Sequence, residues 1–289
     1  MTELRVTYYP DITQKVDPAR VRGAIVAFAD ALQAELTRVL AKEIRVRVAD
    51  VLSVPDQYTD LLEGNAHIAL MKPVAYVFAH LRDEKILPAC VAHRPIDGEV
   101  GTTYFGQVYA RANLGIRSLE DLAEQPAGTL RMAFGERFST SNFLVPASML
   151  RGAGIHPFLF FKTIEFAGGH DFAAEAVYEG RADIGAGHDG VIKILGDSQP
   201  DAEERLVRLS REFIHSDPVV VHSGVLPDGV SYEIVQTACA AIAKTAPVRE
   251  ALDLFWGWVK DLSPTEDANY QSIRDAIERL DLRETDMLQ

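Results

Sequence analysis

The chain has 289 residues, of which 47% are hydrophobic and 25% charged, a composition typical of a globular protein with one large domain or two of ordinary size. Its 29 lysines and arginines against 42 aspartates and glutamates give a net charge of −13, which argues against general binding to nucleic acids or to an anionic membrane surface, since both need a basic face. It contains no run of about 18 apolar residues, so no membrane-spanning helix is expected.

The first residues, 1–10, enter a predicted strand directly and show neither the basic nor the apolar stretch of an export signal. A cytoplasmic protein and an exported protein whose signal has been removed would both begin in this way.

The chain has two cysteines, Cys90 and Cys239, and both lie among apolar residues. Buried free thiols are the first interpretation, and a disulfide between them stays open. No zinc-type cysteine spacing and no HExxH motif is present, so we expect neither a metal ion nor a cofactor.

The first half of the chain alternates predicted strands and helices. Strands are expected at 4–8, 44–49, 66–71 and 86–93, and helices at 18–41, 58–64 and 73–80. This order is typical of a mainly parallel sheet with helices on both faces.

A long extended segment at 102–110 leads into a second set of the same kind. Strands are expected at 130–134, 158–166 and 182–186, helices at 139–152 and 172–180, and extended segments at 206–213 and 218–222. Three further helices, at 232–245, 248–258 and 269–280, have no evident strand partner.

This order predicts an α/β protein of two α/β lobes joined by two extended crossings. Lobe one would comprise residues 1–107 and 218–289, and lobe two residues 108–217. In such proteins the ligand usually lies in the cleft between the lobes, at the carboxyl ends of strands.

Three hydroxyl residues, Ser139, Thr140 and Ser141, stand where the 139–152 helix is expected to begin. Serine and threonine are good N-caps, and the first backbone N–H groups of a helix lack intrahelical partners. Hydroxyls and N–H groups together can hold a phosphate-like oxyanion at the positive end of the helix dipole. An ordinary capped helix is the alternative.

Other polar residues also follow predicted strands. These are Tyr9, Lys72, the Gly168–His170 turn and the His188–Asp189 pair. Ligand residues in open α/β sheets occupy such positions.

Several segments in this order resemble the phosphonate/phosphite-binding proteins of ABC importers, a type II periplasmic binding protein family. The matching segments are 58–69, 73–76, Tyr104, 118–122, Ser139–Ser141 with Pro146, 169–171 with 176–183, and 216–220. The resemblance covers most of the chain and implies the two-lobed fold of that family.

The resemblance implies ligand contacts for particular residues. Ser139, Thr140 and Ser141 match the run that binds the phosphonate oxygens, and Tyr58, Tyr104 and His170 match further contacts to the anion. Asp217 and Asp189 match acidic residues that hold the amine of aminoalkylphosphonates. A carboxylate facing a phosphonate would be repulsive without a cation between them, and a ligand amine supplies one.

Each of these residues also has an ordinary interpretation. Tyr58 would then be a surface aromatic and Tyr104 a hinge-packing residue, with His170 purely structural. Asp189 and Asp217 would be cap, turn or loop residues.

Two positions depart from the family pattern. Asn142 stands where glycine is common, and its side chain would narrow the pocket or add a hydrogen bond. Lys72 replaces a small or apolar residue and would be either a solvated surface lysine or a positive charge near the ligand.

The resemblance predicts a binding protein, not an enzyme, that captures a small phosphonate or related oxyanion for an ABC permease. It implies a periplasmic or cell-surface lipoprotein location, and we expect a monomer or weak dimer. Two alternatives stay open: a cytoplasmic or tethered sensory module, and a biosynthetic enzyme on the same fold.

Overall fold

The structure is a computed structural model that describes residues 2–9, 16–50, 53–96 and 99–287. The chain divides into two compact units: unit 1 is Met1–Thr103 with His215–Gln271, and unit 2 is Tyr104–Ile214 with Ser272–Gln289. The division expected from the sequence placed all of 218–289 in lobe one. The C-terminal residues instead belong to unit 2, where Arg279 Nη1 donates to Ser148 Oγ at 2.9 Å.

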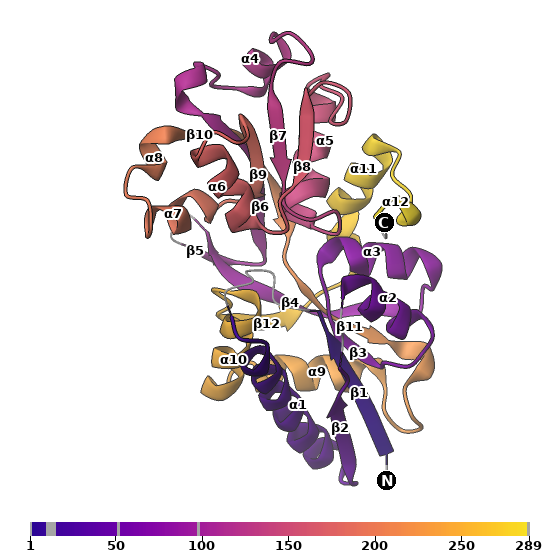
Figure 1. Cartoon of the computed structure of the whole chain (residues 1–289). Coiled ribbons are helices and arrows are strands. Elements are labelled where there is room, and N and C mark those ends of the chain that lie inside the picture. Colours follow the sequence, from indigo (N-terminus) through magenta and orange to yellow (C-terminus); the bar gives the residue numbers. More distant parts are fainter. Residues whose placement is uncertain (1, 10–15, 51–52, 97–98, 288–289) are drawn as a thin grey trace. The chain divides into compact units, whose positions relative to one another are not determined.

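Unit 1 is built on a sheet whose strands lie in the order β12-β4-β11-β3-β1-β2, with β5 paired to β4 (Figure 1). The strands are β1 (Thr2–Tyr8), β2 (Ile44–Val48), β3 (Ile68–Leu70), β4 (Ile86–Ile96), β5 (Glu99–Gly101), β11 (Pro218–His222) and β12 (Asp261–Pro264). β1 is parallel to β2 and β3, and β11 is antiparallel to β3 and β4. Therefore β1, β3 and β4 all end at the same edge of the sheet, the edge at which β11 begins.

The helices of unit 1 follow the predicted pattern closely. They are α1 (Pro18–Leu40), α2 (Val54–Leu62), α3 (Pro73–Arg82), α9 (Tyr232–Ile242) and α10 (Ala246–Trp256), with short 3-10 helices η3 (Ser223–Val225) and η4 (Asp267–Tyr270). α1 buries a stripe that includes Ile25, Phe28 and Leu32, and it packs against α10 and β2 (Figure 1). This amphipathic spacing is what predicted the helix.

Unit 2 has its own sheet, in the order β10-β6-β9-β7-β8. The strands are β6 (Thr103–Arg111), β7 (Arg131–Phe134), β8 (Thr163–Phe166), β9 (Ile184–His188) and β10 (Leu206–His215). β7 is parallel to β8 and β9, and β6 is antiparallel to β9. The ends of β7, β8 and β9 and the start of β6 therefore share one edge, which we call the carboxyl edge of unit 2.

The remaining helices surround that sheet or lie near the C-terminus. They are η1 (Ala112–Leu114), α4 (Leu119–Ala123), the π-helical turn η2 (Thr140–Leu144), α5 (Val145–Gly152), α6 (His170–Tyr178), α7 (Val191–Gly196), α8 (Ala202–Arg205), α11 (Gln271–Leu280) and α12 (Glu284–Met287). α6 packs on β9 and β7, beside α7 (Figure 1).

Three expectations from the sequence were wrong in detail. The apolar stretch at 158–166 is mostly turn, and only Thr163–Phe166 is a strand; Leu159 is 74% exposed. The helix expected at 58–64 begins earlier, because the Ser53 hydroxyl accepts from Asp56 N and caps it at that point. The C-terminal helices were expected to have no strand partner, but β12 lies between the second and the third of them and pairs with β4.

Candidate functional site

The hydroxyl run begins a buried helical turn, as its sequence predicted. Ser139 is the N-cap of η2, and its Oγ accepts from the backbone N–H of Asn142 at 3.1 Å. Ser139, Thr140 and Ser141 are 5%, 2% and 4% exposed. The run follows β7, so it lies at the carboxyl edge of unit 2 with the helix dipole directed at it.

Asn142 ties this turn to the end of β7. Its Oδ1 accepts a short hydrogen bond from the backbone N–H of Gly135. A Cβ on Gly135 would lie 2.4 Å from Asn142 Nδ2, so only glycine leaves room for this side chain. Asn142 thus makes a hydrogen bond within the protein that joins the turn to the end of β7, and its expected effect on the pocket stays a prediction.

His170 is held at the same edge by a hydrogen bond from His188, the last residue of β9. It is the first residue of α6, and its Nδ1 accepts from the backbone N–H of His188 at 3.2 Å. The two imidazole rings lie with centroids 4.8 Å apart. Because Nδ1 is an acceptor, a neutral His170 carries its hydrogen on Nε2 and can donate from there.

Two further predicted residues belong to this edge. Tyr104 is half-buried near the start of β6, and Asp189 follows β9 directly, where its N–H donates to Phe105 O at 3.1 Å. Gln107 is almost fully buried and donates from Nε2 to His188 O at 3.0 Å. The fold of unit 2 thus brings Ser139–Ser141, Tyr104, His170 and Asp189 to one edge of a single sheet.

The other two predicted residues, Tyr58 and Asp217, lie in unit 1. Tyr58 is on α2 and is 2% exposed, which excludes the surface-aromatic interpretation. Asp217 immediately precedes β11, where its backbone carbonyl accepts from Ala92 N at 3.0 Å. It therefore lies at the edge where β3 and β4 end.

The carboxylate of Asp217 already has a cation within the chain. Arg94 on β4 donates from Nη2 to Asp217 Oδ2 at 2.6 Å, and from Nε to Ser216 Oγ at 3.1 Å. Burial raises the pKa of Asp217, and the positive charges of Arg94 and Lys72 oppose that rise. The structure thus gives Asp217 a cationic partner within the chain, and the expected contact of Asp217 with a ligand amine stays a prediction.

Lys72 is buried, which corrects the interpretation of a solvated surface lysine. Lys72 is the N-cap residue of α3, shortly after the end of β3, and it is 6% exposed. Its Nζ lies 5.2 Å from the centroid of the Tyr9 ring. Its positive charge acts on Asp217, and the other interpretation, a positive charge near the ligand, stays a prediction.

The sequence did not single out Arg94. It stands 123 residues from Asp217, and no local pattern marks it as part of a site. Its one readable signal was an arginine directly after the apolar strand predicted at 86–93, and a charge is rarely buried without a partner.

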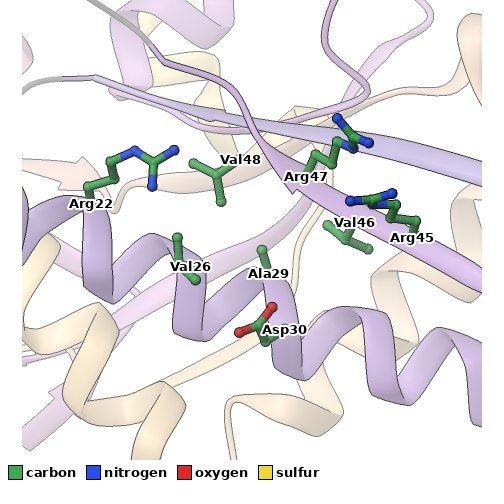
Figure 2. Close-up of a pocket in the computed structure, with 8 residues that line it drawn as sticks. All are labelled: Arg22, Val26, Ala29, Asp30, Arg45, Val46, Arg47 and Val48. Carbon is green, nitrogen blue, oxygen red and sulfur yellow. The ribbon is translucent and has the colours of Figure 1, made fainter.

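A groove of about 240 Å³ lies elsewhere in unit 1, between α1 and β2 (Figure 2). It is lined by Arg22, Val26, Ala29, Asp30, Arg45, Val46, Arg47 and Val48. Two of its arginines are engaged in surface ion pairs, Arg22 with Asp50 and Arg47 with Glu3. None of the predicted ligand residues lines this groove.

Cys90 and Cys239 are buried free thiols, as first interpreted, and burial raises the pKa of both. Within the described ranges, no cluster of three or more His, Cys, Asp or Glu side chains is placed to hold a metal ion. The described helices include none with the length and apolar character needed to span a bilayer.

Comparison with known proteins identifies the family to which this chain belongs. The model of the family described as "ABC transporter, phosphonate, periplasmic substrate-binding protein" matches residues 12–270. The phosphate-import protein PhnD of Mycolicibacterium smegmatis is 27% identical over 188 residues, which are 63% of this chain and 56% of that protein. The match thus spans little more than half the length of this curated relative.

Solved structures share the fold across nearly the whole chain. PhnD1 from Prochlorococcus marinus, in complex with methylphosphonate, matches with a TM-score of 0.70 at 20% identity, covering 97% of this chain and 98% of that one. XAC2383 from Xanthomonas citri, bound to ATP, matches with a TM-score of 0.76 at 14% identity, with the same coverage.

The fold is that of the type II periplasmic binding proteins, as the sequence predicted. The family match over most of the chain goes further than the fold: this protein belongs to the phosphonate-binding periplasmic substrate-binding proteins of ABC transporters.

Proposed function

We propose that the protein captures a small phosphonate or a related phosphorus oxyanion and delivers it to an ABC permease. The observation that carries the proposal is the buried run Ser139–Ser141 at the start of a helical turn. Three hydroxyls and first-turn N–H groups supply uncharged donors to a tetrahedral oxyanion, and they discriminate by geometry rather than by net charge.

The neighbouring residues support an anion at this position. His170 would donate from Nε2, since its Nδ1 is engaged by His188. Asn142 Nδ2 is buried beside the run and has no hydrogen-bond partner within the described ranges. A buried donor without a partner is costly, and an oxyanion would satisfy it.

The eight predicted residues form the proposed set of ligand contacts. They are Ser139, Thr140, Ser141, Tyr58, Tyr104, His170, Asp217 and Asp189. In this set the hydroxyl and imidazole donors bind the phosphorus oxygens. Asp217, which accepts a hydrogen bond from Arg94, and Asp189 are the proposed contacts to the amine of an aminoalkylphosphonate.

We further propose that the protein acts outside the cytoplasm, in the periplasm or at the cell surface, and that it works as a monomer or weak dimer without turning over its ligand. The family supports the first point. ³¹P NMR of a bound phosphonate over a day tests the last: an unchanged ligand spectrum is expected, and the appearance of product would favour an enzyme.

The ligand class is tested by a thermal-shift screen of methylphosphonate, phosphite and phosphate, with sulfate and acetate as controls. A ligand that binds only the native state raises the melting temperature in proportion to ln(1 + [L]/Kd). We expect a rise with at least one phosphorus oxyanion and none with acetate. No shift with any phosphorus oxyanion would contradict the proposal.

A further inference from the structure

The two cysteines of the chain lie at one contact in the core of unit 1. Cys90 is on β4 and Cys239 is on α9, and both side chains are fully buried within the same hydrophobic cluster. α9 packs directly on β4. Because the two residues are far apart in the sequence, only the fold brings the two thiols to the same contact.

Hydrogen bonds in both directions hold α9 against β4 at this contact. Gln236 on α9 donates from Nε2 to Ala89 O at 2.9 Å. Cys90 donates from Sγ to Gln236 O at 3.5 Å. The thiol of Cys90 therefore touches the backbone of the helix that carries Cys239.

The geometry of the helix places Cys239 beside the same carbonyl group. Cys239 follows Gln236 by three residues, so both lie on one face of α9. In a helix, a γ atom can lie against the carbonyl oxygen three residues earlier, as serine hydroxyls do. Both sulfurs can therefore reach Gln236 O. Burial raises the pKa of Cys239, and the charge of Cys90 raises it further, an effect that requires the two groups to be close.

The two cysteines also belong to different parts of the chain. Unit 1 is made of two segments, Met1–Thr103 and His215–Gln271, with Tyr104–Ile214 of unit 2 between them. Cys90 lies in the first segment and Cys239 in the second. A covalent link here would join the two segments of unit 1 and would close a long loop, the kind of loop for which a cross-link restricts the unfolded chain most.

We propose that Cys90 and Cys239 close to a disulfide that joins β4 to α9 when the chain folds in the presence of a disulfide oxidant. One cysteine thiolate attacks the S–S bond of the oxidant and displaces a thiolate from it, and the second cysteine thiolate displaces the other from the mixed disulfide. The two cysteines lose two protons and two electrons in total, and the oxidant is reduced to two thiols. Compartments outside the cytoplasm supply such oxidants.

The bond forms during folding, because the folded protein hides both thiols. Burial raises the pKa of Cys90 to about 12, and only the thiolate attacks a disulfide. The reaction therefore precedes the packing of α9 on β4. Once formed, the bond should resist reductants until the protein is unfolded.

The test uses the whole wild-type chain, reduced and unfolded in urea, and then refolded with either oxidised glutathione or dithiothreitol. Each refolded sample is unfolded in iodoacetamide, and its intact mass and its peptides are measured. We expect no alkylation and a Cys90–Cys239 peptide pair after refolding with oxidised glutathione, and alkylation of both cysteines after refolding with dithiothreitol. The oxidised protein should melt about 5–10 °C higher than the reduced protein.

Cys239→Ala is the matched control, because it keeps Cys90 and removes its partner. Its melting temperature should be the same under the two refolding conditions. Alkylation of both cysteines, or glutathione on both, in folded wild-type protein from the oxidised sample would overturn the proposal. A Cys90–Cys239 link found only in protein without a cooperative melt would also overturn it, since the bond would then not fit the folded unit. The wild-type result decides by itself even if the variant does not fold, and it does not depend on which ligand the protein binds.

Discussion

Arg94 and Asp217 form a buried ion pair across adjacent strands of unit 1, with Nη2 and Oδ2 2.6 Å apart. The guanidinium also donates to Ser216 and to two backbone carbonyls, so it joins β4 to the start of β11 and to the end of α10. These hydrogen bonds fix the position of the Asp217 carboxylate, and they also contribute to the stability of the fold.

Arg94→Met should therefore destabilise the protein by about 3–5 kcal/mol, because it leaves the buried Asp217 carboxylate without the cation that donates a hydrogen bond to it. Urea unfolding measures the loss. The double variant Arg94→Met with Asp217→Asn should recover more than about 1 kcal/mol, since the carboxylate that lost its ion-pair partner is then also removed. Equal losses in the single and double variants would show that the ion pair is not the source of the effect.

Gly135 and Asn142 should be coupled. Gly135→Ala places a Cβ 2.4 Å from Asn142 Nδ2 and should cost about 1–3 kcal/mol through overpacking. In an Asn142→Gly background the same substitution should cost less than about 1 kcal/mol, because the clashing side chain is gone. A double-mutant cycle of unfolding free energies reads this coupling, and additive costs would contradict the contact.

His215 should make stability depend on pH. Burial, with a smaller contribution from the charge of His93, lowers the pKa of His215 from 6.5 to about 4. Between these values the unfolded chain binds the proton and the folded protein does not, so this stability is present above about pH 6.5 and is lost as pH falls toward 4.

Comparison of wild type with His215→Asn isolates this effect from that of other histidines. The wild-type free energy of unfolding should fall more steeply over this range, by up to about 1.4 kcal/mol per pH unit, the value for one proton. Parallel curves for the two proteins would mean that His215 titrates normally in the folded state.

His170 should act through Nε2, not through Nδ1. Asparagine can reproduce the acceptor that Nδ1 presents to His188 N, but it cannot reach as far as Nε2. We expect His170→Asn to keep the wild-type melting temperature within a few degrees and to lose about tenfold in affinity for methylphosphonate, the loss of one hydrogen bond to a charged group. Full affinity in this variant would remove His170 from the ligand contacts.

Local signals in the sequence were sufficient to predict that the hydroxyl run Ser139–Ser141 begins a helical turn. An N-cap is decided by residues a few positions apart, and the bond from Asn142 N to Ser139 Oγ spans three. Ser118, in the matching segment 118–122, shows the same local pattern: its hydroxyl accepts from Asp121 N, three residues on, and caps α4. The end of β7 was placed correctly, at Phe134, whereas β9 was expected at 182–186 and lies at Ile184–His188.

The features that the sequence did not predict depend on contacts between residues that are far apart in the chain. Leu159 and Phe158 read as part of a strand because they are apolar, yet no neighbouring strand pairs with them, and both are exposed. β12 is a four-residue edge strand that ends in proline, too short for its alternation to be recognised. The burial of Lys72 and its place beside Asp217 follow from strand order in the sheet, which periodicity alone does not determine.

The central claim, that the hydroxyl run holds a phosphorus oxyanion, is tested most directly by calorimetry with methylphosphonate on the triple variant Ser139→Ala, Thr140→Ala, Ser141→Ala. Ser118→Ala is the matched control, because it removes a cap of the same kind in the same unit, and each cap is worth about 1 kcal/mol of stability. With folding verified by thermal melts, the account predicts binding to wild type and to the control, and at least about 100-fold weaker binding to the triple variant. Undiminished binding to the folded triple variant would contradict it.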